Sequence, residues 1–171
     1  MIKLIVSKAL AMVLIVTTGF VMALNSLEKE VSLPSIEIET LDEEVFLSEN
    51  LIEKGKPTLV VFWATCCAPC KKELGSISES YRPLINETNA NIVAISVDLP
   101  KYKNGVKPFV KEKGWKFPIY LDINKKLMHA LNASNTPHTF LFNKEGIIVW
   151  EKQGFSDGDE KIIFQKIREV S

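Results

Sequence analysis

Apolar residues recur along the chain with two different periods, and these periods predict the order of strands and helices. Uninterrupted apolar runs at 58–64 and 91–97 are typical of strands buried on both faces. The stretch from 67 to about 86 repeats its apolar residues at helical spacing, and Pro83 is expected to kink or shorten this helix. The same criteria predict the remaining elements in order: a helix over 105–113, a strand over 117–122, a helix over 125–131, a strand over 139–142, a strand over 147–150 and a last helix from Asp157 or Asp159.

A different pattern precedes the first buried strand. Residues 36–39 and 45–47 alternate apolar and polar positions around an acidic turn, which predicts a β-hairpin. Ser48 is expected to cap a short helix that ends before Gly55. Alternating strands and helices require parallel strands, whereas the last two strands, joined by the turn 143–146, form an antiparallel hairpin. We therefore expect an α/β fold with a central mixed sheet flanked by helices.

The N-terminal segment has a different composition from the rest. Residues 1–24 combine a basic start with an uncharged apolar run, which is typical of a signal peptide or of an N-terminal membrane anchor. We expect residues 25–35 to be a polar linker and residues 36–171 to be one domain. Either fate of the first segment predicts an extracytoplasmic domain, in the periplasm or at the outer face of the cytoplasmic membrane.

Charge argues against one class of partner. The 171 residues contain 21 Lys and Arg and 21 Asp and Glu, so the formal net charge is zero. A protein of this charge has no strong basic field to attract a phosphate backbone. We expect no nucleic-acid partner.

The candidate chemistry lies where the first buried strand meets the first long helix. Cys67 and Cys70 form a Cys-x-x-Cys motif at this junction, and Pro69 suits the first helical turn. Free N–H groups and the helix dipole stabilise a thiolate at a helix start, which lowers its pKa. The pattern predicts reversible thiol–disulfide exchange, with Cys67 attacking and Cys70 resolving. A zinc site is the alternative, but the chain, with three cysteines and two histidines in all, has no second Cys-x-x-Cys and no His-x-His cluster.

The residues around this motif carry a resemblance. The stretch from Phe62 to Leu74, with Trp63 and Cys67-Ala68-Pro69-Cys70, resembles the active site of the thioredoxin superfamily and is similar to that of TlpA/ResA-like extracytoplasmic thiol–disulfide oxidoreductases. The resemblance covers roughly residues 32–170. It implies a thioredoxin-like fold with an N-terminal hairpin and a central βα insertion.

The resemblance also implies a function. Members of that group act mostly as reductants of protein disulfides, often in cytochrome c maturation, and a membrane electron donor re-reduces them. We therefore expect a monomeric protein-disulfide reductase with no cofactor and no bound metal. In such proteins a cis proline lies against the active disulfide, and the residue before it pairs with the substrate backbone. Thr136 and Pro137 match these positions.

Two further residues have two interpretations each. Glu73 lies one helical turn after Cys70, where an acid in the resembled group relays the proton of the resolving thiol; otherwise it is a solvated helix charge. His138 follows Pro137, where it either titrates near the active site or is a hydrogen-bonded strand residue.

Cys66 departs from the resembled pattern, which has Trp immediately before the first active cysteine. It is either a bystander or a modulator of the pair. The rival function is a copper chaperone of the Sco type, which would use Cys66, Cys70 and a histidine, because thiolates and imidazole suit copper. A peroxidase is a weaker alternative, because the motif is a dithiol rather than a lone peroxidatic cysteine.

Overall fold

The computed structural model describes residues 33–171, which form one compact unit. The predicted hairpin is β1 (Glu37–Thr40) and β2 (Val45–Leu47), followed by the 3-10 helix η2 (Ser48–Leu51). The remaining elements follow in order: β3 (Thr58–Trp63), α2 (Ala68–Thr88), β4 (Asn91–Ser96), η3 (Pro100–Tyr102), α3 (Lys103–Lys113), β5 (Ile119–Leu121), α4 (Lys126–Ala130), β6 (His138–Phe142), β7 (Ile148–Gln153) and α5 (Asp159–Glu169).

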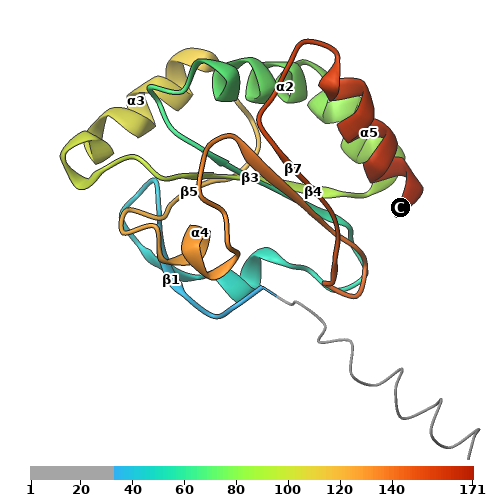
Figure 1. Ribbon diagram of the computed structural model, residues 1–171, viewed down its shortest axis with the longest axis horizontal. Coiled ribbons are helices and arrows are strands. Elements are labelled where there is room, and N and C mark those ends of the chain that lie inside the picture. The colour runs from blue at the N-terminus through green and yellow to red at the C-terminus, as the bar shows by residue number, and fades with distance from the viewer. Residues whose placement is uncertain (1–32) are drawn as a thin grey trace, which may run out of the picture. The chain divides into compact units, whose positions relative to one another are not determined.

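All strands join one seven-stranded sheet in the order β2-β1-β5-β4-β3-β6-β7 (Figure 1). The pairs β3/β4 and β4/β5 are parallel, and the others are antiparallel. The sheet is therefore mixed, as the order of elements predicted. The α3–β5 unit places β5 between β4 and the N-terminal hairpin, which confirms the expected central insertion and thioredoxin-like arrangement.

Two apolar layers lie on the two faces of the sheet. Helices α2, α3 and α5 cover one face, and α4 lies on the other (Figure 1). Strand β3 is buried along its whole length because it contributes to both layers, with Leu59, Val61 and Trp63 toward the long helices and Val60 and Phe62 toward α4. This double burial explains why β3 shows an uninterrupted apolar run rather than alternation.

Two local expectations were wrong: a shortening of the first long helix at Pro83 and a helix cap by Ser48. Helix α2 is not shortened at Pro83 but continues to Thr88, because a proline removes one backbone donor while Leu84 still buries its side chain against the sheet. Ser48 does not cap η2. Its hydroxyl accepts the N–H of Ile36 and donates to the carbonyl of Pro34, so it links the start of η2 to the segment before β1.

The signal peptide or anchor expected at 1–24, and the linker as far as residue 32, lie outside the described residues. Leu33 is buried in the layer on the α4 face. Within residues 33–171, no helix is both long and apolar enough to cross a membrane.

Candidate active site

The active-site turn connects β3 to α2 and holds a disulfide between Cys67 and Cys70, with Cα atoms 5.3 Å apart. Cys67 is the N-cap of α2, and its sulfur accepts the backbone N–H of Cys70 at 3.2 Å. Pro69 occupies the second helical position, where its missing donor leaves no hydrogen bond unmade. After reduction, the same N–H and the helix dipole stabilise a Cys67 thiolate.

The two sulfurs differ in accessibility. Cys67 is partly exposed, whereas Cys70 is completely buried among the apolar residues under α2. A partner molecule can therefore reach Cys67 but not Cys70. This asymmetry matches the predicted roles of an attacking and a resolving cysteine.

Glu73 lies one turn further along α2, and its side chain is buried, with 1% of its surface exposed. Its Oε1 accepts the hydroxyl of Thr139 at 2.6 Å, while Oε2 has no partner among the described residues. Burial raises the pKa of Glu73 from 4.5 to about 7, although the Thr139 hydrogen bond and the charge of Lys152 act against this rise. The solvated-charge interpretation is therefore wrong, and the carboxyl can exchange a proton near neutral pH.

The Thr136–Pro137 bond, directly before β6, is cis, as the resemblance implied. The carbonyl of Pro137 accepts the N–H of Gly154, which anchors this turn to the end of β7. Thr136 is partly exposed, and no backbone hydrogen bond within residues 33–171 involves its N–H or carbonyl. The Thr136 backbone is thus free to pair with an extended segment.

His138 lies on the face of β6 opposite to Thr139. Its ring stacks on Phe140, with centroids 4.4 Å apart, and its Nδ1 is buried without a partner in the described part of the chain. Nε2 lies 3.8 Å from an oxygen of Glu151. Burial lowers the pKa of His138, so the ring is neutral at neutral pH. Of its two interpretations, the strand residue fits these contacts, but the expected hydrogen bond is not made by Nδ1.

Cys66 is a free, exposed thiol. It lines a groove of about 330 Å³ between the active-site turn, the loop after β4 and the turn before Pro137; Thr136, Asp98 and Tyr102 also line it. In residues 33–171, no three His, Cys, Asp or Glu side chains come together as a metal site. The copper alternative, which needs Cys66, Cys70 and a histidine, therefore has no support in the geometry.

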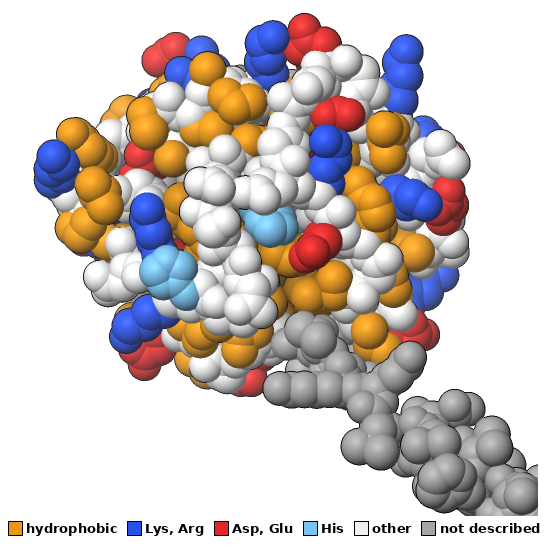
Figure 2. Space-filling view, viewed as in Figure 1, with side chains coloured by type: hydrophobic (Ala, Val, Ile, Leu, Met, Phe, Trp, Pro, Cys, Tyr) orange, Lys and Arg blue, Asp and Glu red, His pale blue; other side chains and the backbone are white. Residues whose placement is uncertain are grey.

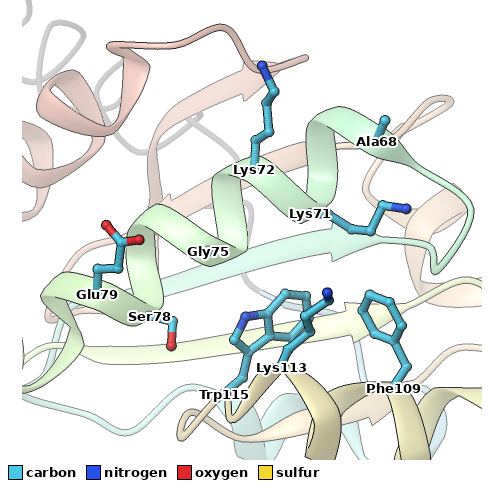
Figure 3. Close-up of a pocket in the computed structure, with 9 residues that line it drawn as sticks. All are labelled: Ala68, Lys71, Lys72, Gly75, Ser78, Glu79, Phe109, Lys113 and Trp115. Atoms are coloured by element: carbon cyan, nitrogen blue, oxygen red, sulfur yellow. The ribbon is translucent and has the colours of Figure 1, made fainter.

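Trp63 ends β3 in an aromatic cluster. Its ring lies 5.1 Å from that of Trp115 and 5.8 Å from that of Phe109. The latter two rings line a groove of about 590 Å³ between α2 and α3, with Lys71 and other polar residues at its rim (Figure 3). This groove adjoins the start of α2, but no cysteine lines it, so it is not the exchange site itself.

One group at the site was missed by sequence reasoning. Asp98 follows β4 and is buried. Its carboxylate accepts the N–H of Thr65 at 2.9 Å, the hydroxyl of Thr65 at 2.6 Å and the hydroxyl of Ser96 at 2.8 Å. Asp98 therefore holds the turn two residues before Cys67. An acid directly after a buried strand was the available signal, but only the pairing of Trp63 with Ser96 brings Thr65 and Asp98 together.

The face of the molecule in Figure 2 has mixed chemistry. Basic, acidic and apolar side chains are interspersed over its described part. On α2, Lys72 forms an exposed ion pair with Asp157 at 3.0 Å. Such pairs contribute little to stability.

A family model and curated proteins match parts of this chain. A model of the AhpC/TSA family matches residues 30–151. The chain is 38% identical over 96 residues to the thiol-disulfide oxidoreductase ResA of Bacillus subtilis, covering 56% of this chain and 52% of that protein. It is 34% identical over 116 residues to ResA of Bacillus cereus, covering 68% of this chain and 60% of that protein. The chain thus spans about half to three fifths of these curated relatives.

Solved structures match over more of the length. A thioredoxin-like protein from Porphyromonas gingivalis superposes with a TM-score of 0.72 at 32% identity, covering 81% of this chain and 90% of that one. StoA from Bacillus subtilis superposes with a TM-score of 0.60 at 26% identity, covering 78% and 97%. The thioredoxin-like fold expected from the sequence is therefore confirmed.

Proposed function

The chain belongs to the AhpC/TSA family, and on this premise we propose that it is a thiol–disulfide oxidoreductase that exchanges the Cys67–Cys70 pair with disulfides of partner proteins. One observation carries the proposal. An accessible and a buried sulfur form a disulfide at the N-terminus of α2, where a backbone N–H donates to the accessible one. This arrangement supplies a nucleophile and a protected resolving thiol.

In the reductive direction the reduced enzyme begins the exchange. The Cys67 thiolate attacks one sulfur of the partner disulfide, which forms a Cys67–partner disulfide and releases the other partner sulfur as a thiolate that takes up a proton. The unpaired backbone of Thr136 supports the proposal that the partner binds as an extended strand beside the cis proline.

The second step requires Cys70 to ionise. Its proton passes to the Glu73 carboxylate, and the Cys70 thiolate attacks the sulfur of Cys67. The Cys67–Cys70 disulfide forms, and the second partner sulfur leaves as a thiolate. The buried position of Glu73 and its pKa of about 7 support this role as proton acceptor. Two electrons have then moved from the enzyme to the partner.

We further propose that the protein acts as an extracytoplasmic reductant of the cytochrome c maturation type, re-reduced by a membrane electron donor, and that it works as a monomer. The support is the likeness to proteins named ResA and the basic-then-apolar composition of residues 1–24. A fusion of residues 1–35 to alkaline phosphatase, which is active only outside the cytoplasm, tests the location. An inactive, cytoplasmic fusion contradicts it.

The exchange is tested with three serine variants in an insulin reduction assay. Cys67→Ser is expected to abolish reduction. Cys70→Ser is expected to accumulate a mixed disulfide with the substrate, detected by mass under non-reducing conditions. Cys66→Ser is the matched control, because Cys66 lies beside the pair but outside the disulfide. Full activity of Cys67→Ser would exclude the proposed reaction.

Direction is tested by the reduction potential of the Cys67–Cys70 pair. A potential well below that of glutathione is expected for a reductant, and an oxidised Cys-x-x-Cys-His peptide should then accept electrons from the enzyme. A potential above that of glutathione would identify an oxidant or an isomerase instead.

A further inference from the structure

Groups from several elements act on Glu73. Thr139 of β6 donates a hydrogen bond to it, Lys152 of β7 and Asp159 at the start of α5 act on it through their charges, and the Cys67–Cys70 disulfide lies at the start of its own helix. Among these neighbours Lys152 is the only cation, and Asp159 is the only other carboxylate. The disulfide carries no proton while it is oxidised.

Strand register places Lys152 beside Thr139, the residue that hydrogen-bonds Glu73. Thr139 and Lys152 are direct partners in the antiparallel β6–β7 ladder, so their side chains leave the sheet on the same face. That is the face where Thr139 donates its hydrogen bond to Glu73. The side chain of Lys152 is about one quarter exposed (26%), although β7 is an edge strand.

Asp159 restrains Lys152. Its Oδ2 lies 2.9 Å from Nζ of Lys152 and also accepts the N–H of Ser156 at 2.7 Å. The Asp159 side chain is itself only 18% exposed. The ion pair therefore holds the ammonium of Lys152 at a defined position near the end of β7.

A buried carboxyl can accept a proton only if it is ionised beforehand, and burial disfavours that form. The Thr139 hydroxyl donates one hydrogen bond to Oε1 of Glu73, and Oε2 of Glu73 has no partner in the described residues. An ammonium nearby is the remaining group that can favour the charge.

Resting on the proposed exchange reaction, we propose that Lys152 is a positioning residue whose charge keeps Glu73 able to ionise against the opposing charge of Asp159, and thereby sets the pH range in which Cys70 is deprotonated. The step itself moves one proton: Cys70–SH and Glu73–COO⁻ become Cys70–S⁻ and Glu73–COOH. Glu73 later returns its proton to water.

The two charges act on Glu73 with opposite signs. The cation of Lys152 lowers the pKa of Glu73, and the anion of Asp159 raises it. Removing each charge should therefore shift the titration of Glu73 in opposite directions. A purely structural role for the ion pair predicts no such reversal, since either substitution would break the same contact.

The experiment measures the titration of Glu73 in the oxidised full chain by carboxyl ¹³C NMR, with Glu73→Gln to assign the signal. Lys152→Met is expected to raise the midpoint by about one pH unit, and Asp159→Asn to lower it. Lys152→Arg should restore the wild-type midpoint. Lys166→Met, which breaks a Lys166–Glu169 pair of 2.6 Å within α5, is the matched control and should leave the midpoint unchanged.

A second readout links the titration to the reaction. The pH profile for resolution of a Cys67 mixed disulfide should move to higher pH in Lys152→Met by the same amount as the Glu73 midpoint. An unchanged midpoint in Lys152→Met, or shifts of the same sign in Lys152→Met and Asp159→Asn, overturns the proposal. If Lys152→Met fails to fold, Lys152→Gln makes the same test.

The tests distinguish a failure of the proposed function from a failure of the role proposed for Lys152. The former would appear as full activity of Cys67→Ser, whatever the midpoint of Glu73. Conversely, an unshifted Glu73 with an inactive Cys67→Ser variant would remove the role of Lys152 and leave the exchange reaction standing.

Discussion

The buried carboxyl of Glu73 should make the stability of the oxidised protein depend on pH in a specific way. Its pKa rises from 4.5 to about 7 on folding. Between these values the folded protein binds a proton that the unfolded chain releases, so the free energy of unfolding falls as pH rises through this window. The substitution Glu73→Gln removes the titration while keeping the size of the side chain and its oxygen acceptor for Thr139.

The magnitude follows from the pKa change. One pKa unit corresponds to about 1.4 kcal/mol, so ionising Glu73 costs the folded protein about 3 kcal/mol once the pH exceeds its folded pKa. Relative to Glu73→Gln, the wild-type protein is therefore expected to lose about 3 kcal/mol of stability between pH 4 and pH 8.5. Other titrating groups are common to both proteins and cancel in this comparison.

The assay is urea unfolding of both oxidised proteins at several pH values, followed by tryptophan fluorescence. Glu79→Gln is the matched control, because it makes the same substitution at an exposed position of the same helix. The pH-dependent difference for Glu73→Gln is expected to exceed that for this control. A constant difference between the wild-type protein and Glu73→Gln would show that Glu73 ionises at ordinary pH, and would refute its role as a proton acceptor near neutrality.

Three further predictions concern the surroundings of the Cys67–Cys70 pair. Asp98→Ala leaves three donors without their acceptor and is expected to lower the free energy of unfolding, measured by urea unfolding, by about 2–4 kcal/mol. Asp98→Asn should lose less, and a stability of Asp98→Ala equal to that of the wild-type protein would contradict the anchoring role. Because burial lowers the pKa of His138, the free energy of unfolding of the wild-type protein should fall as the pH drops below about 6.5, and that of His138→Phe should fall less. Parallel plots of this free energy against pH for the two proteins would exclude a buried neutral ring. Cys66→Trp is expected to keep insulin reductase activity, and its complete loss would make Cys66 part of the mechanism.

The sequence predicted most of the fold because the relevant patterns are local. The apolar run of β3 and the helical spacing of α2 are properties of neighbouring residues, and both elements lie within a few positions of their predicted bounds. The Cys-x-x-Cys at their junction follows from the same local order. Its disulfide and the partial exposure of Cys67 agree with the exchange chemistry expected from that position.

Local patterns were insufficient where a contact joins distant segments. Helical spacing put Glu73 near Cys70, but it could not say whether water or protein lies against the carboxyl. That depends on Thr139, 66 residues later, which donates the hydrogen bond, and on β7 and α5, which close over this face. The two interpretations of Glu73 therefore remained equal until the packing was known.

The order of elements, the buried central strand and the reactive pair at a helix start could be predicted, because residues close in the chain specify them. The accessibility of each cysteine, the burial of Glu73 and the contact of Asp98 with the turn before Cys67 depend on tertiary packing. Strand register brings Thr65 to Asp98 and Lys152 beside Thr139. Register and burial arise when segments dozens of residues apart pack together, and that packing changes the proton affinity of the groups it encloses.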